Sequence, residues 1–220
     1  MMTEREMLEY MDKSEDVVVD ETVMGWINTL VKAKREDIRA DLAKILVSYE
    51  GECVEQALLK LATDKKYSVR LEAIDSLSNF PSDSTYQTLM QYAEDKDWLT
   101  RGYALWGICK TCLGERKVET IQYIKNVLEI ETSKFCRINM YGGMCILGEK
   151  ENILNLLSLY PNSYYRNKCS IFNTLHELLL EMESTYRTEI ELFCEEIQLE
   201  MENEPISVQS SFNRLRDLLK

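Results

Sequence analysis

Residues 54–77, with the sequence VEQALLKLATDKKYSVRLEAIDSL, decide the fold of this chain of 220 residues. The first half of the segment places apolar residues on one helical face, at Val54, Ala57, Leu58 and Leu61. A polar link with turn and N-cap residues follows at 63–68, and helical spacing then resumes from 69 to 80, before Pro81. The segment therefore predicts two helices joined by a short turn.

The same hairpin recurs along the chain and is marked by a repeated basic residue. Basic residues follow one another at separations of 31, 31, 36 and 31 residues, at Arg39, Arg70, Arg101, Arg137 and Lys168. Around the first four, mainly apolar residues lie one position before the arginine and three, four and seven positions after it. A fixed period of this length indicates stacked supersecondary units, each too small to bury its own apolar face.

The period predicts an all-α chain of about six helical hairpins. First helices are expected at about 22–33, 52–63, 83–94, 117–130, 149–160 and 185–203, with second helices in the intervals. No linker rich in Pro, Gly or Ser interrupts the series, so we expect a single elongated domain over 1–220. Residues 1–20 would cap the N-terminal end of the repeats at 21–183, and 184–220 would form an acidic C-terminal unit and cap. Four apolar residues would close that last end: Val208, Phe212, Leu215 and Leu219.

The central hairpin carries a family resemblance. The stretches LLKLATD at 58–64 and SVRLEAIDSL at 68–77 resemble a HEAT repeat, and residues 95–108 resemble a second, more divergent one. The resemblance implies a right-handed α-α superhelix with terminal capping helices. It also implies a ladder of turn aspartates and second-helix arginines between units, which Asp64, Asp95, Arg70 and Arg101 match. The specific match covers 54–109, because the unit around Arg137 lacks the turn aspartate.

Composition restricts the classes of partner. The net charge is −12, and residues 177–204 contain ten Glu and one Arg, which leaves −3 for the other 192 residues. This balance opposes the neutralisation of phosphates on which nucleic-acid binding depends, so we do not expect nucleic acid as a partner. No positive leader with an apolar core begins the chain and no apolar run reaches bilayer length, which predicts a cytoplasmic protein without a membrane partner.

Catalytic and metal-binding patterns are weak. His176 is the single histidine, and Leu180 stands where a zinc-protease helix would place a second one. Cys109 and Cys112 have the spacing of a redox or zinc pair, but Cys136 and Cys145 are too far apart to form a second close pair. We therefore expect a partly buried structural histidine, core thiols, and neither a metal nor a cofactor.

The opposite face of the second helices predicts a binding surface. Positions two, five and nine after each basic residue lie away from the apolar set, and in HEAT-like solenoids this row lines the concave surface. From this row we select six candidate partner-binding residues: Tyr103, Trp106, Lys110, Asn139, Gly142 and Asn173. Exposed Trp and Tyr are enriched in interface hot spots, and the glycines would leave room for a side chain. The alternative is that the chain itself covers Trp106 and that the glycines allow tight helix crossing.

The acidic segment predicts a long amphipathic helix. Its apolar stripe has spacings of four, four, three, four and four residues, at Met182, Tyr186, Ile190, Phe193, Ile197 and Met201. The glutamate face is either a solvated surface or a site that attracts a basic partner through long-range steering.

These observations favour a non-enzymatic scaffold that binds a protein or peptide partner. A sharper form of the hypothesis is an acidic inhibitor or immunity-type protein that binds a basic partner, which rests on charge and size. The alternative is an enzyme similar to solenoid DNA glycosylases or chromophore lyases. Glycosylases of that kind need a basic concave face, whereas the predicted row offers two lysines against several carboxylates.

Overall fold

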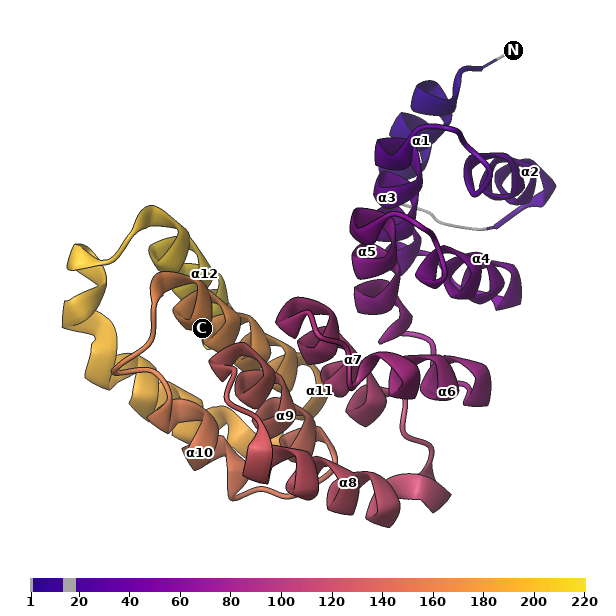
Figure 1. Cartoon of the computed structure of the whole chain (residues 1–220). Coiled ribbons are helices and arrows are strands. Elements are labelled where there is room, and N and C mark those ends of the chain that lie inside the picture. The colour runs from indigo at the N-terminus through magenta and orange to yellow at the C-terminus, as the bar shows by residue number, and fades with distance from the viewer. Residues whose placement is uncertain (1, 14–18) are drawn as a thin grey trace. The chain divides into compact units, whose positions relative to one another are not determined.

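The computed structural model describes residues 2–13 and 19–220, apart from the side chain of Glu183, and every regular element in these ranges is a helix (Figure 1). The prediction of an all-α chain is confirmed. The chain divides into two compact units, unit 1 at Met1–Leu113 and unit 2 at Gly114–Lys220. The boundary falls within the 36-residue step between Arg101 and Arg137. A single domain over the whole length stays a prediction, and part of the predicted N-terminal cap, at 14–18, lies outside the described residues.

Unit 1 consists of one N-terminal helix followed by three hairpins. The bounds are α1 Glu4–Lys13, α2 Glu21–Leu30, α3 Glu36–Ile45, the short 3-10 turn η1 Leu46–Ser48, α4 Glu52–Ala62, α5 Tyr67–Leu77, α6 Asp83–Tyr92 and α7 Trp98–Lys110. The first helices α2, α4 and α6 pack in order, and the second helices α3, α5 and α7 form a parallel row beside them (Figure 1). This is the stacking that the 31-residue period predicts.

Side-chain caps begin several of these helices. Asp20 Oδ1 accepts a hydrogen bond from the Val23 amide at 2.8 Å at the start of α2. Asp97 Oδ2 does the same for the Thr100 amide at 2.8 Å at the start of α7. Each such cap satisfies an amide that has no partner within its helix, at a gain of about 1 kcal/mol.

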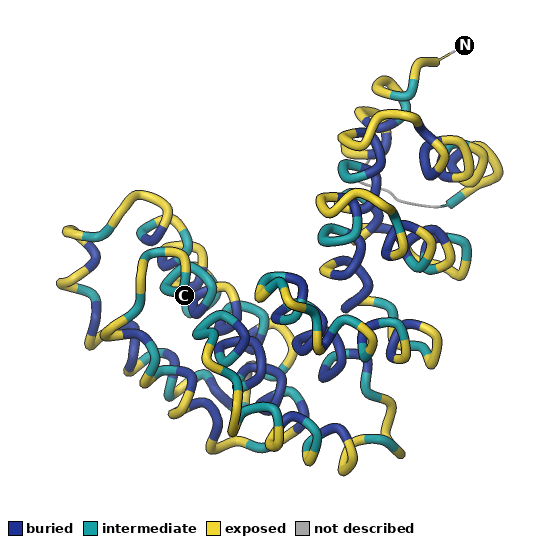
Figure 2. Tube along the Cα trace, in the orientation of Figure 1, coloured by how far each residue is buried: buried dark blue, intermediate teal, exposed yellow. Residues whose placement is uncertain are grey.

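The apolar positions of the repeat form the core of unit 1. The residues three, four and seven positions after each arginine are all fully buried: Leu42, Ala43, Leu46, Ala73, Ile74, Leu77, Ala104, Leu105 and Ile108. Figure 2 shows the buried residues as a continuous band where neighbouring helices of the unit face each other. Burying a Leu or Ile side chain contributes about 1.5–3 kcal/mol, so the repeated pattern supplies the energy for stacking.

Unit 2 starts with two hairpins and then becomes irregular. Its bounds are η2 Gly114–Arg116, α8 Lys117–Ile130, α9 Lys134–Ile146, α10 Asn152–Ser158, α11 Tyr165–Ile197, the 3-10 segment η3 Gln198–Asn203 and α12 Ile206–Asp217. Helix α11 packs against α9, α10 and α12 and therefore organises the unit. Its core includes an aromatic cluster, in which the ring of Tyr160 lies 5.6 Å from Phe172 and 5.3 Å from Phe193 between centroids.

Helix α11 contains a kink close to one expected boundary. The sequence predicts a separate first helix from about 185, and α11 consists of two helices joined at one non-helical residue, Met182, at φ −145° and ψ 40°. The predicted stripe continues after this kink, because Tyr186, Ile190, Phe193, Ile197 and Met201 are all buried. None of the described helices is both long and apolar enough to cross a bilayer.

Candidate functional site

The repeated arginines close the turn of their own hairpin. In each of the first four units, the guanidinium donates to the backbone carbonyl oxygen six residues earlier. The acceptors are Ala33 at 2.6 Å for Arg39, Asp64 at 2.8 Å for Arg70, Asp95 at 2.6 Å for Arg101 and Glu131 at 3.2 Å for Arg137. These carbonyls lie just after the first helix, where helical partners are missing. The arginine period therefore records a structural hydrogen bond.

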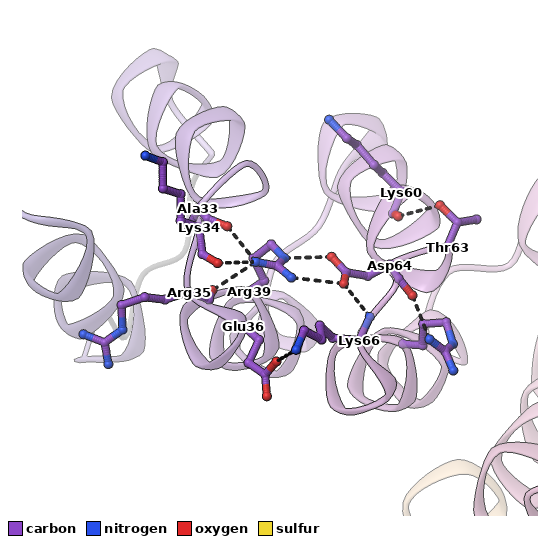
Figure 3. A network of polar contacts seen from close by, with 10 residues as sticks. Ala33, Lys34, Arg35, Glu36, Arg39, Lys60, Thr63, Asp64 and Lys66 are labelled. Atoms are coloured by element: carbon purple, nitrogen blue, oxygen red, sulfur yellow. Dashed lines mark hydrogen bonds and ion pairs between the residues drawn. The ribbon is translucent and has the colours of Figure 1, made fainter.

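Arg39 also joins the first two hairpins of unit 1 (Figure 3). Its Nε and Nη2 atoms donate to the two carboxylate oxygens of Asp64 at 2.7 and 3.0 Å, and the side chains are only 8% and 14% exposed. This hydrogen bonding raises the pKa of Arg39 and lowers the pKa of Asp64. The predicted ladder is thus present at this step. At the next step, Asp95 Oδ1 accepts from the Asp97 amide of its own turn at 2.8 Å, as Asp64 Oδ1 does from the Lys66 amide at 2.8 Å.

The fifth unit replaces the arginine pattern with another arrangement. The carbonyl oxygen six residues before Lys168 belongs to Asn162, and it accepts a hydrogen bond from Lys134 Nζ at 2.5 Å. Lys168 instead forms an ion pair with Glu204, and its Nζ lies 4.6 Å from the centroid of the Tyr160 ring. The basic residue at this position therefore connects α11 to the segment that precedes α12.

Three of the predicted site residues lie on α7 in unit 1. Tyr103 is half-buried, and burial, with the nearby charge of Asp75, raises the pKa of its hydroxyl. Lys110 Nζ donates to Asn79 Oδ1 at 3.1 Å. Trp106 is only 8% exposed, so it offers little surface to a partner. Tyr103 and Lys110 are therefore the accessible members of this group.

The other three predicted site residues lie in unit 2. Asn139 and Gly142 are both buried on α9, and Asn139 Nδ2 donates to the Phe135 carbonyl oxygen at 2.9 Å. Asn173 is exposed on α11, where its Oδ1 accepts from Arg214 Nη2 at 2.5 Å. Asn173 is thus the accessible residue among the three. A groove that combines these residues with those of α7 stays a prediction.

Gly107 serves close packing within unit 1. A methyl group at this position would lie 2.8 Å from Cδ1 of Leu89 and 3.5 Å from Cβ of Ser78. Since real Cβ atoms do not approach other heavy atoms to 2.8 Å, a side chain would force α7 or Leu89 to move. Gly107 therefore allows α7 to pack closely against Leu89 of α6.

The histidine and the cysteines show no catalytic geometry. His176 is half-buried, and burial together with the charge of Arg214 lowers its pKa against the opposing effect of Glu177. Burial raises the pKa of the Cys109 thiol above its ordinary range and that of Cys145 to about 12, which disfavours the reactive thiolate. Among the described residues, no three or more His, Cys, Asp or Glu side chains gather as a metal site would require.

The comparisons with known proteins agree with the repeat geometry. Residues 23–131 match the family model of HEAT repeats. This is a HEAT-repeat protein. The matched segment extends beyond 54–109 on both sides and includes all three hairpins of unit 1 and helix α8. HEAT repeats are generally scaffolds for protein interaction, because their stacked hairpins create extended binding surfaces. A search of curated proteins finds no match to the chain.

Sequence reasoning does not identify two exposed leucines in unit 2 of this HEAT-repeat protein. Leu154 on α10 and Leu192 on α11 are 63% and 61% exposed, and both line one surface groove. A signal for Leu192 exists, since it lies beside the buried stripe and among glutamates on the polar side of the predicted helix. Leu154 has no such signal, because α10 is too short to separate its faces by pattern.

Proposed function

We propose that this HEAT-repeat protein is a non-enzymatic scaffold that binds a protein or peptide partner along the row of second helices. The main support for the proposal is that the second helices of unit 1 have one buried face and one accessible face. Residues three, four and seven positions after each arginine are buried, while most residues at positions two, five and nine remain at least partly accessible. A regular scaffold with a polar, aromatic-bearing row is suited to binding rather than to chemistry.

The row in unit 1 favours a basic partner segment. Asp41, Glu72 and Asp75 contribute three carboxylates on α3 and α5, against the two lysines Lys44 and Lys110. Burial raises the pKa of Glu72, and the charge of Asp41 adds to this effect against that of Lys44. Asp41 already accepts a hydrogen bond from Arg5 Nη1 at 2.7 Å, and a cationic side chain of the partner would favour the charged form of Glu72.

Tyr103 supplies the aromatic contact beside the carboxylates. Tyrosine offers large, stiff apolar area together with a polar atom, which suits it to a binding hot spot. Trp106, Lys110, Asn139, Gly142 and Asn173 belong to the same proposal, with Lys110 and Asn173 as the accessible polar contributors. A narrower form of the scaffold proposal is an acidic inhibitor or immunity-type protein that acts in the cytoplasm.

The enzymatic alternative has less support. A solenoid DNA glycosylase must hold a phosphate backbone, and the second-helix row of unit 1 carries an excess of negative charge. A chromophore lyase would need a site with convergent polar groups. Asp41 of the row lines a cavity of 420 Å³ with Glu9 and Asp12 of α1, and none of the described residues that line it is aromatic.

The test is quantitative affinity capture from the native host with wild-type protein, Tyr103→Ala and the control Tyr164→Ala. Tyr164 is a 70% exposed tyrosine of unit 2 that lies off the row. Tyr103→Ala should reduce recovery of the partner about tenfold, and high salt should reduce recovery for the wild type. Equal recovery with Tyr103→Ala and with the wild type, at unchanged melting temperature, would contradict the proposal.

A further inference from the structure

Unit 2 carries an apolar groove between α10 and the part of α11 that follows Met182. The groove has a volume of 460 Å³ and is lined on the α10 side by Leu154 and Leu157 and on the α11 side by Leu192, Phe193 and Ile197. Leu154 and Leu192 are more exposed than buried, at 63% and 61%. Their side chains thus face solvent from both walls of one hollow.

Three carboxylates border this apolar surface. Glu189, Glu196 and Glu200 line the same groove and follow one another at separations of seven and four residues, which places them along one helical face. None of the three has an ion-pair partner among the described residues. Since all three project from one wall, their negative potential adds along the groove.

Tyr160 adds a buried hydroxyl at the wall of the groove. Its side chain lines the groove but is only 2% exposed, and its hydroxyl has no hydrogen-bond partner in the described part of the chain. Burial, with the charges of Glu204 and Glu200, raises the pKa of this hydroxyl, so it keeps its proton. A buried hydroxyl without a hydrogen-bond partner raises the free energy of the folded protein. A ligand that accepts a hydrogen bond from this hydroxyl would remove that penalty.

We propose that this groove binds a short amphipathic helix of a partner protein, with apolar residues on one side and Lys or Arg along its border. The acidic border from Glu189 to Glu200 covers 12 residues of α11 and η3, and its 11 steps extend about 17 Å at the helical rise, which matches a helix of three turns. Apolar anchors at positions i, i+3 or i+4 and i+7 would contact the leucines. Basic residues beside these apolar anchors would pair with the carboxylates, and a polar group of the bound helix would accept a hydrogen bond from the Tyr160 hydroxyl.

The chemistry of the groove selects against other classes of ligand. Anionic membranes and nucleic acids would be repelled by the three carboxylates. A small cationic amphiphile shares the charge and apolarity but cannot span three turns of the border. The inference rests on the proposed scaffold function. It uses a different surface, because the groove lies between α10 and the part of α11 after Met182, whereas the proposed partner-binding row lies on the second helices.

The experiment uses the full chain and a displayed library of random 14-residue peptides. Peptides selected on the wild type should carry net positive charge with apolar residues at helical spacing. Their dissociation constants are then measured by fluorescence anisotropy on variants. Leu192→Ser should weaken binding about tenfold, and the triple variant E189Q/E196Q/E200Q should weaken it about tenfold and abolish most of its salt dependence.

Two further variants complete the design. Tyr160→Phe should weaken binding about threefold to tenfold without lowering the melting temperature, because it removes a hydroxyl that the free protein leaves unpartnered. The control Leu199→Ser alters a leucine that is 85% exposed and does not line the groove, and it should leave binding unchanged.

Several results would overturn the inference. These are a selection without binders, binders that lack basic residues, affinities indifferent to Leu192→Ser, and displacement of the peptides by dodecyltrimethylammonium at equal affinity. Binders that are lost with Tyr103→Ala but retained with Leu192→Ser would support the row in unit 1 and overturn the groove. Binders lost only with Leu192→Ser support the groove, even if capture of the native partner proves indifferent to Tyr103.

Discussion

Removal of the Asp64 carboxylate provides the sharpest test of how the hairpins of unit 1 are joined. Asp64→Ala deletes both oxygens that accept from Arg39, at 2.7 and 3.0 Å, and leaves the guanidinium in a site where its side chain is 8% exposed (Figure 3). Arg39 keeps its acceptor at Ala33, but the opposite charge is gone. The penalty is therefore that of a buried charge without its counter-ion.

The expected loss follows from these contacts. Removing one partner of a buried ion pair costs about 3–5 kcal/mol, and each hydrogen bond to a charged group contributes about 1.5–3 kcal/mol. Since Arg39 retains backbone carbonyl acceptors in the turn between α2 and α3, we expect a value near the lower limit, about 3 kcal/mol. With a urea m value of about 2 kcal/mol/M, the midpoint of unfolding should fall by about 1.5 M.

A second ion pair between the same two hairpins supplies a matched control. Lys66 Nζ lies 2.7 Å from Glu36 Oε2, but these side chains are 50% and 49% exposed. Exposed pairs contribute about 0–1 kcal/mol, so Lys66→Ala should shift the urea midpoint by less than about 0.5 M. Both variants remove an ion pair between α3 and the turn before α5, but Asp64→Ala also removes the acceptor of the Lys66 amide, at 2.8 Å from Asp64 Oδ1. The contrast therefore measures the buried pair together with this turn hydrogen bond.

Tryptophan fluorescence follows this transition selectively. All three tryptophans, Trp26, Trp98 and Trp106, belong to unit 1, so their emission in urea reports on this unit. Equal midpoints for Asp64→Ala and Lys66→Ala would refute the reasoning, since they would mean that the buried pair contributes no more than the exposed one.

The effect should also depend on pH. Because Arg39 lowers the pKa of Asp64 in the folded state, the carboxylate stabilises the fold above its unfolded pKa of about 3.9. This stabilisation is lost as the pH falls through the lower, folded pKa. The difference in unfolding free energy between wild type and Asp64→Ala should therefore shrink from pH 7 to pH 3, and a constant difference would contradict the electrostatic explanation.

Two further substitutions test the packing of each unit. Gly107→Ala should destabilise unit 1 by about 1 kcal/mol, because the contact with Leu89 costs more than the helix propensity gained; a higher urea midpoint by tryptophan fluorescence would contradict this. Tyr186→Phe should destabilise unit 2 by about 1 kcal/mol, because it removes the buried hydrogen bond from Tyr186 Oη to the Cys145 carbonyl oxygen at 2.8 Å. Circular dichroism during urea unfolding measures it, and an unchanged curve would show that the bond contributes nothing.

The sequence predicts the hairpins of unit 1 because local and long-range signals agree there. The fourth residue of each second helix must reach the carbonyl six positions earlier, which an arginine does, and the next turns must be apolar to stack. Periodicity captures both requirements. It does not distinguish Asp64, which accepts from Arg39 and from its own turn, from Asp95, which accepts from its own turn, because an aspartate two residues before an amide suits a turn and a ladder equally well.

The candidate site is harder to predict, because helical periodicity states which side a residue faces but not what covers it. Trp106 and Asn139 occupy row positions and are nevertheless buried, at 8% and 6% exposed. Exposed Leu192, in contrast, belongs to a segment that reads as a solvated acidic helix. Burial depends on elements distant in sequence, and a one-dimensional pattern contains them only where the repeat is regular.

The departure of the fifth unit from the repeat explains why the proposed groove lies where it does. In the regular units an arginine occupies the carbonyl at the end of the first helix, but here Lys134 binds the Asn162 oxygen, and Lys168 is available for Glu204 and the Tyr160 ring. The Tyr160 hydroxyl has no hydrogen-bond partner in the described part of the chain. A repeat that satisfied every polar group internally would have no such atom to offer a ligand. The irregular unit is therefore the part of this scaffold that is best prepared for a specific partner.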